Sequence, residues 1–221
     1  MVKLLKEHNR LNETLFMGVL TIICFALFVF RFIYTGSMFF MFLNWNLFLA
    51  FIPWALTSLM VLKPNYQKKP IVVYVLLVAW LIFFPNAPYI LTDLFHLRLR
   101  YSMPMWFDLV LILSFAWTGL LFGLLSLWDI EKIMARFMKR VWVISISTAL
   151  LFIGSFGVYI GRYLGWNSWN VINEPYRLMN DIGTRIINPI DHPGAWGMTV
   201  VLGLFLNMIY WSFHFIRMRD Q

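Results

Sequence analysis

The sequence predicts an all-α membrane protein, a polytopic bundle of about six transmembrane helices. Of its 221 residues, 61% are hydrophobic, 19% are aromatic and only 13% are charged, whereas soluble domains carry about 25% charged residues. The apolar residues stand in long blocks, and a soluble fold of this size could not bury them all. Lys and Arg flank the blocks, as expected beside anionic lipid headgroups.

Six segments are long enough to cross the hydrocarbon core, which takes about 20 apolar residues in a helix. They are residues 14–34, 38–62, 71–91, 105–128, 141–161 and 195–216. The first is too long for the apolar region of a signal peptide and lacks an A-x-A-like cleavage site, so we expect it to be retained. Without a linker or low-complexity stretch, we expect residues 1–221 to form a single transmembrane domain.

The distribution of basic residues predicts that both termini are cytoplasmic. In this orientation the cytoplasmic segments hold 12 of the 18 Lys and Arg residues, including every lysine, and the outer segments hold six arginines. The net charge of +8 therefore indicates a membrane surface, not nucleic acid. The single cysteine, Cys24, excludes an intrachain disulfide or a thiolate zinc site and is expected to pack in the bundle.

The third span is predicted to break at Pro85 and Pro88. From Ile71 to Phe84 a helix would rise about 21 Å, less than the core thickness of about 30 Å. Each proline removes a backbone donor, so the break should lie where protein or a wet cavity satisfies the backbone. Asn86 is a candidate N-cap for a short second helix. We expect that helix to present a polar face on the outer side: Tyr89, Asp93, His96 and Arg100. Asn86, Tyr89 and Arg100 are candidate ligand-binding residues there.

Asp93 and His96 are the leading site candidates, as an acid–base pair or as metal ligands. The Asp-x-x-His spacing could chelate a divalent metal, with His192 as a further ligand. No recognised metal or nucleophile motif occurs, so the cofactor, if there is one, stays open. The cytoplasmic segments are short and basic, and we therefore expect the chemically interesting groups on the outer side.

Further polar residues near the outer side have both a structural and a functional interpretation. Asp108 is a third candidate catalytic group, or the structural partner of Arg31. Asn44 and Asn46 are expected to form interhelical hydrogen bonds. A second set could hold an anionic ligand, or could form an aromatic belt with a snorkelling arginine: Arg162, Trp166 and Trp169.

Two features concern packing and the outer surface. Residues 175–188 alternate apolar and charged positions with helical spacing, which predicts a helix lying in the membrane interface. The pairs Gly119/Gly123 and Gly157/Gly161 have small-xxx-small spacing. We expect contacts within the bundle, with a protein partner at these faces as the alternative.

Two motifs resemble a bacterial integral membrane family of unknown function, domain-of-unknown-function family 1361. They are F-P-N-A-P-Y-I-L-T-D-L-F-H-L with the following M-P-x-W-x-D-L, and Y-x-G-R-x-x-x-W-N-x-W at Tyr159 to Trp169. The resemblance covers nearly the whole chain and implies a multi-pass protein of the bacterial inner membrane. It supplies no activity, substrate or catalytic residue.

Three functions follow from the sequence as hypotheses. The first is an outer-leaflet site that binds or modifies a lipid or envelope ligand, with or without catalysis. The second is a non-catalytic accessory or scaffold subunit of an envelope complex. The third is a small-solute transporter, for which a broken helix is the supporting feature.

Overall fold

The structure is a computed structural model that describes residues 6, 10–67, 69–98 and 103–219, with side chains up to residue 216. Two compact units make up the chain, Met1–Ile130 and Glu131–Gln221. Throughout the described residues the regular structure is helical. Six helices there are long and apolar enough to cross a membrane, which confirms the predicted fold class. They are Leu11–Thr35, Met41–Leu62, Pro70–His96, Met105–Met134, Arg140–Leu164 and Pro193–Ile216.

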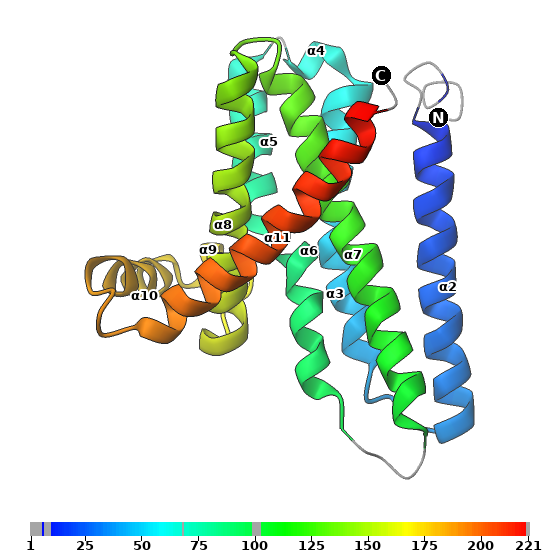
Figure 1. Cartoon of the computed structure of the whole chain (residues 1–221). Coiled ribbons are helices and arrows are strands. Elements are labelled where there is room, and N and C mark those ends of the chain that lie inside the picture. The colour runs from blue at the N-terminus through cyan, green and yellow to red at the C-terminus, as the bar shows by residue number, and fades with distance from the viewer. Residues whose placement is uncertain (1–5, 7–9, 68, 99–102, 220–221) are drawn as a thin grey trace. The chain divides into compact units, whose positions relative to one another are not determined.

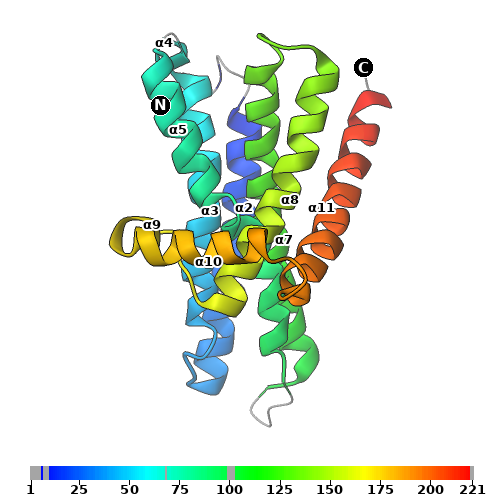
Figure 2. The same cartoon turned by 90° about the vertical axis from the view of Figure 1, so that its left-hand side faces the viewer.

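The first unit contains four of these spans. Helices α2 (Leu11–Thr35) and α3 (Met41–Leu62) run beside α7 (Met105–Met134), which continues into the second unit (Figures 1 and 2). Gly36 ends α2 in the left-handed conformation, at φ 66°, which glycine adopts without strain. After the short α4 (Pro64–Gln67), the chain returns along α3 as α5 (Pro70–Phe83).

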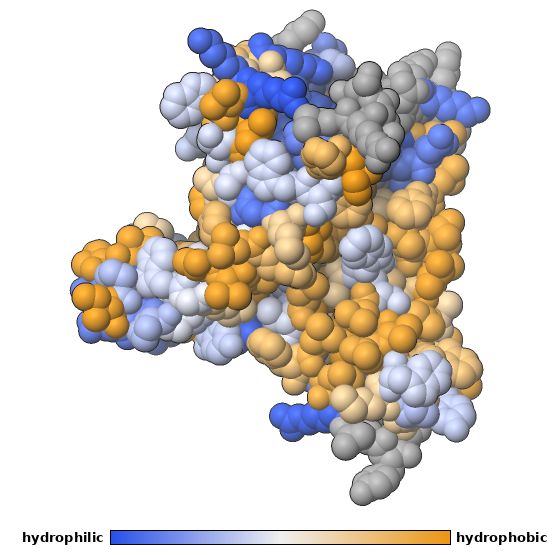
Figure 3. Space-filling view, in the orientation of Figure 1, coloured by the Kyte–Doolittle hydropathy of each residue, from blue (hydrophilic) through white to orange (hydrophobic). Residues whose placement is uncertain are grey.

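The core of the first unit lies where α2, α3 and α7 meet. Cys24 is buried there, with its Sγ 3.3 Å from Thr118 Oγ1, in agreement with its expected packing role. The other side of α2 and α7 presents a nearly continuous hydrophobic surface (Figure 3), including Ile22, Phe30 and Ile33. This outward apolar surface is what a lipid-facing helix requires.

The third span is broken at the predicted place. Helix α5 ends at Phe83, and α6 (Asn86–Tyr89) starts after Pro85. The expected N-cap role of Asn86 is wrong: no side chain caps α6, and Asn86 Nδ2 instead donates to the Phe83 carbonyl oxygen at 2.8 Å. Pro85 and Pro88 have no backbone N–H to donate to a carbonyl of the preceding turn. The Asn86 side chain therefore supplies a hydrogen bond to one carbonyl at the break.

After the break the chain forms a 3₁₀-helix, η1 (Ile90–His96), and not the α-helix expected to run to Arg100. Three residues per turn align side chains at i and i+3. Asp93 and His96 therefore lie on the same side of η1. Tyr89 belongs to α6 and precedes η1, so α-helical spacing does not relate it to Asp93. Arg100 lies outside the described residues.

Gly119 and Gly123 face contacts within the chain, as expected for a bundle, and a protein partner at this face stays a prediction. A Cβ atom on Gly119 would lie 2.6 Å from Ile90 Cδ1, and one on Gly123 would lie 2.7 Å from Ala87 Cβ. Both contacts come from the segment after the proline break. The two glycines thus let α7 approach α6 closely enough to cover the interrupted backbone.

This close approach predicts that Gly123→Ala destabilises the protein by about 1–3 kcal/mol, as overpacking does. The Ala87 Cβ cannot move away, because it is fixed to the α6 backbone. Adding Ala87→Gly removes the clash and should recover most of the loss. The free energy of unfolding in mixed micelles gives the measurement, with Gly18→Ala as control, since a Cβ at Gly18 has no atom within 4 Å. No cost in Gly123→Ala would contradict the packing.

The second unit pairs two long helices, α8 (Arg140–Leu164) and α11 (Pro193–Arg219). Gly203 allows the pairing, since a Cβ there would lie 2.2 Å from Phe152 Cδ1. Between them come α9 (Asn170–Asn173) and α10 (Pro175–Ile187), and α10 runs crosswise to α8 and α11 in Figure 2. The predicted helix at 175–188 is thus present. Its place in the membrane interface, and a partner at Gly157/Gly161, stay predictions.

Candidate functional site

Asp93 and His96 form the centre of a polar cluster in the first unit. Asp93 is 1% exposed, and its Oδ2 accepts a hydrogen bond of 2.8 Å from Asn46 Nδ2 on α3. The His96 side chain is 38% exposed, with Nδ1 4.0 Å from Asp93 Oδ1. Nδ1 is buried without a hydrogen-bond partner among the described residues. The cluster therefore joins a fixed carboxylate to a partly accessible imidazole.

The fold produces this arrangement through the proline break. The 3₁₀ turn stacks His96 above Asp93, and η1 lies against α3, which supplies Asn46. The His96 ring lies 5.1 Å from the Phe42 ring, centroid to centroid, which restricts its rotation. Asn46 was expected only to bridge helices. Its bond to Asp93 makes it part of the candidate site, and sequence reasoning missed that role.

Asp108 lies in a separate buried ion pair with Arg31. Arg31 Nε donates to Oδ1 at 2.6 Å, and Nη2 donates to Oδ2 at 3.2 Å. Both side chains are almost fully buried, and the guanidinium carbon lies 4.4 Å from the centre of the Phe40 ring. Both carboxylate oxygens are therefore occupied by one arginine. This geometry matches the structural interpretation of Asp108, since a bidentate arginine pair is strong and directional.

A second buried ion cluster, which sequence reasoning missed, lies where α2 begins. Arg10 Nη1 donates to Asp129 Oδ2, while Nη2 donates to Glu13 Oε1 at 2.6 Å and to Ser58 Oγ at 2.9 Å. Trp54 Nε1 donates to the same Glu13 oxygen at 2.7 Å. The Arg10 cluster consists of ion pairs and hydrogen bonds that join α2, α3 and α7, so it does not test the expectation that the chemically interesting groups lie on the outer side, which stays a prediction.

The two ion pairs share one spacing. Arg10 and Arg31 are 21 residues apart along α2, and Asp108 and Asp129 are 21 residues apart along α7. In a helix this is about 31 Å, close to the hydrocarbon thickness of about 30 Å. The two antiparallel helices are thus joined by an ion pair near each end of α2. This spacing could have revealed the pairs, had both helices been read together.

The residues predicted around the second motif lie in the second unit. Trp166 Nε1 donates to Asp181 Oδ2 on α10 at 2.7 Å, and Trp196 Nε1 donates to the Arg185 carbonyl at 2.9 Å. These bonds hold α10 to the ends of α8 and α11. Arg162 is partly buried on α8, Trp169 is exposed before α9, and His192 precedes α11. Their convergence with Asp93 stays a prediction.

The charged residues of α10 pair locally. Arg185 Nη1 lies 3.4 Å from Asp181 Oδ1, and Arg177 Nη1 donates to Glu174 Oε2 at 2.9 Å. The Glu174 hydrogen bond and charge raise the pKa of Arg177 above its ordinary value. The face opposite these charges is apolar and exposed, with Tyr176, Met179 and Ile187. This division agrees with the predicted interfacial helix.

Comparison with known protein families identifies the family of this chain. The family described as "Protein of unknown function (DUF1361)" matches residues 45–209. The chain belongs to this family. No curated protein and no solved structure matches the chain. The matched region of this DUF1361 protein begins inside α3 and includes Asn46, Asp93, His96 and Asp108, whereas Arg10 and Arg31 on α2 precede it.

In the described part of the DUF1361 chain, the site around Asp93 has two potential metal ligands, which is fewer than a metal site needs. Across the described residues, no group of three or more His, Cys, Asp or Glu side chains is placed to hold a metal ion. Asp93 and His96 supply two ligands. Tyr89 is partly buried, and its carbonyl accepts a hydrogen bond from Thr92 Oγ1 at 2.6 Å. The roles expected for Tyr89 and Asn86 in ligand binding stay predictions.

Proposed function

We propose that this multi-pass membrane protein binds, and can chemically modify, a lipid headgroup or envelope ligand at Asp93, His96 and Asn46. The single observation that carries the proposal is the cluster itself: a buried carboxylate, ordered by an amide, beside a partly exposed imidazole with an unused buried nitrogen. Ionisable groups at membrane depth are costly and are usually retained for function.

The chemistry that this cluster supports is proton transfer at the imidazole. An imidazole can both accept and donate a proton, and a neighbouring carboxylate can orient it. The distance of 4.0 Å between Nδ1 and the Asp93 oxygen is longer than a hydrogen bond. Such distances often shorten when a ligand binds. His96 would then act as the proton acceptor or donor, and Asp93 as the residue that positions it.

A non-catalytic accessory role is the second candidate. The exposed apolar face of α10, which includes Tyr176 and Met179, is a surface that a partner protein or the membrane interface would cover. In that role Asp93 would act through its bond to Asn46, by holding η1 against α3. Removing Asp93 would then lower stability, and His96 would be dispensable.

The deciding experiment compares ligand retention with stability. We expect the wild-type protein, purified in mild detergent, to retain a lipid or polar molecule of defined mass in native mass spectrometry. His96→Ala and Asp93→Asn should lower that retention at least tenfold, or about 1.4 kcal/mol, while thermal stability of His96→Ala stays within a few degrees. Phe95→Ala, at an exposed neighbouring position, is the matched control.

Two results would contradict the proposal. In the first, His96→Ala and wild type retain the same amount of ligand, or neither retains any. In both cases only Asp93→Asn loses stability. This result would support the accessory role. The other is labelling of His96→Cys, in a Cys24→Ser background, by an impermeant maleimide only from the cytoplasmic side, because the proposal requires an outer site.

A further inference from the structure

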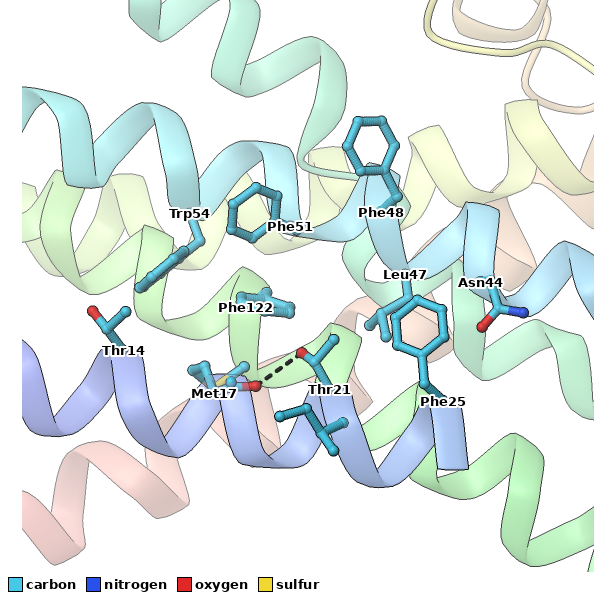
Figure 4. A pocket seen from close by; sticks show the side chains of 12 residues that line it. Thr14, Met17, Thr21, Phe25, Asn44, Leu47, Phe48, Phe51, Trp54 and Phe122 are labelled. Carbon is cyan, nitrogen blue, oxygen red and sulfur yellow. Dashed lines mark hydrogen bonds between the residues drawn. The ribbon is translucent and has the colours of Figure 1, made fainter. Parts of the chain in front are cut away.

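A groove between α2 and α3 is separate from the Asp93 cluster. It has a volume of about 440 Å³ and is closed at its base by Met17, Trp54 and Phe122. Figure 4 shows Asn44 and Phe25 toward one end, and Trp54 and Thr14 toward the other. All these residues belong to the first unit, and neither Asp93 nor His96 lines the groove.

The lining of the groove is apolar except at one end. The hydroxyl of Thr21 is already used, because it donates to the Met17 carbonyl at 2.8 Å, and Thr14 Oγ1 donates to the Arg10 carbonyl at 2.8 Å. Asn44 differs: its Oδ1 is buried and has no hydrogen-bond partner within the described residues. A buried acceptor without a donor carries a free-energy cost, because it has lost its hydrogen bonds to water. An occupant that donates to Asn44 would remove this cost.

The place and size of the groove select a lipid as that occupant. Its walls on α2 and α3 belong to membrane spans, and Ile22, Phe25 and Phe48 at its edges are exposed, so the groove opens where the bilayer lies. A helix with its side chains is about 10–12 Å across, which is too wide to enter a groove between two neighbouring helices. A single acyl chain is narrow enough to enter.

We infer that this groove binds one acyl chain of a bilayer lipid whose polar part donates a hydrogen bond to Asn44 Oδ1. The chain lies along Phe25 and Phe48 toward Trp54, which is itself held by its bond to Glu13. Asn44 is in the first turn of α3, at the depth where a lipid's polar part meets its chains. Hydroxyl- or amine-bearing lipids therefore satisfy Asn44, whereas choline lipids offer no such donor.

The experiment uses the full chain in phosphatidylcholine vesicles containing a small fraction of phosphatidylglycerol with a diazirine on one acyl chain. After illumination, peptide mass spectrometry compares labelling of the groove with labelling at exposed Val201 on α11. We expect the groove to be labelled several-fold more strongly. Gly18 lines the groove and has open space above it, so Gly18→Leu should fill it and lower groove labelling at least fivefold.

Gly197→Leu is the matched control, because Gly197 on α11 also has open space around it and does not line the groove. Its groove labelling should equal that of wild type. Asn44→Leu tests the polar end. It should abolish the preference for the phosphatidylglycerol probe over a phosphatidylcholine probe carrying the same diazirine chain, while leaving labelling by the choline probe intact.

Three outcomes would overturn the inference. Groove labelling no stronger than that at Val201 would mean that lipid contact is nonspecific. Unchanged labelling in Gly18→Leu, with normal thermal stability, would place the chain elsewhere. Stoichiometric cross-linking of the α2–α3 surface to another protein in native membranes would show that a partner helix covers it. None of these outcomes depends on Asp93 or His96, so this inference and the proposed function are tested separately.

Discussion

Replacing Asp108 by Ala is expected to destabilise the protein by about 3–5 kcal/mol, as breaking a buried ion pair does. Arg31 is 1% exposed, and its Nε and Nη2 both donate to Asp108. The substitution would leave a buried guanidinium with only the face of the Phe40 ring beside it. The free energy of unfolding, from SDS titration or steric trapping in bicelles, measures the loss.

A double substitution separates the ion pair from the space that it fills. Arg31→Met with Asp108→Leu removes both charges and retains apolar volume, and such replacements are often neutral. We expect it to recover most of the stability lost in Asp108→Ala. Asp191→Ala, which removes an exposed acid, is the control and should change little. If Asp108→Ala is as stable as wild type while Arg31 stays buried, the pair does not stabilise the fold.

Replacing Arg10 by Ala should also cost about 3–5 kcal/mol. Arg10 is 4% exposed and bridges Asp129, Glu13 and Ser58 from three different elements. Without the guanidinium, two neighbouring carboxylates lose the cation that pairs with both of them. They are Glu13 and Asp129, and Asp129 is only 2% exposed. Arg10→Lys should give an intermediate loss, because an ammonium lacks the planar fork that serves several acceptors at once.

Lys6→Ala is the matched control for Arg10→Ala. Lys6 is exposed and lies four positions earlier, so its removal lowers the positive charge before the first span by the same amount. Both variants would affect topology equally through the positive-inside rule, and only Arg10→Ala removes a buried cation. Equal unfolding free energies for the two variants would show that the Arg10 cluster contributes nothing beyond orientation.

The two ion pairs explain how α2 is held to the rest of the first unit. The helix is otherwise coated with exposed apolar side chains, and lipid provides no hydrophobic force that drives helices together. A pair at each end, 21 residues apart on both helices, fixes the register of α2 on α7. A slip by one helical turn would separate both pairs at once.

Other features of the fold and the candidate site can be predicted from short segments of the sequence. The proline break between Phe83 and Asn86 appeared where the sequence predicted it, because proline acts on its own turn. The consequence of the break was not predictable in the same way. The segment after the break packs against Gly119 and Gly123, which are far along the chain, and the local sequence does not reveal that contact.

The candidate site shows the same division. Asp93 and His96 were identified from their spacing after the break, and their proximity follows from three positions of separation. Asn46 was recognised as a bridging residue, without its partner. Its bond to Asp93 spans 47 positions, and only the packing of η1 against α3 brings the two groups together.

By itself, the sequence determined that the chain crosses a membrane, where its six spans lie and where the third is interrupted. These properties depend on the hydrophobicity of local segments and on the geometry of single residues. The tertiary structure decided which buried charges meet, as with Arg10 and Asp129 at 119 positions apart, and where a groove opens between α2 and α3. These features depend on the order and rotation of neighbouring helices, because each ionic or apolar side chain has many equivalent partners until packing selects one.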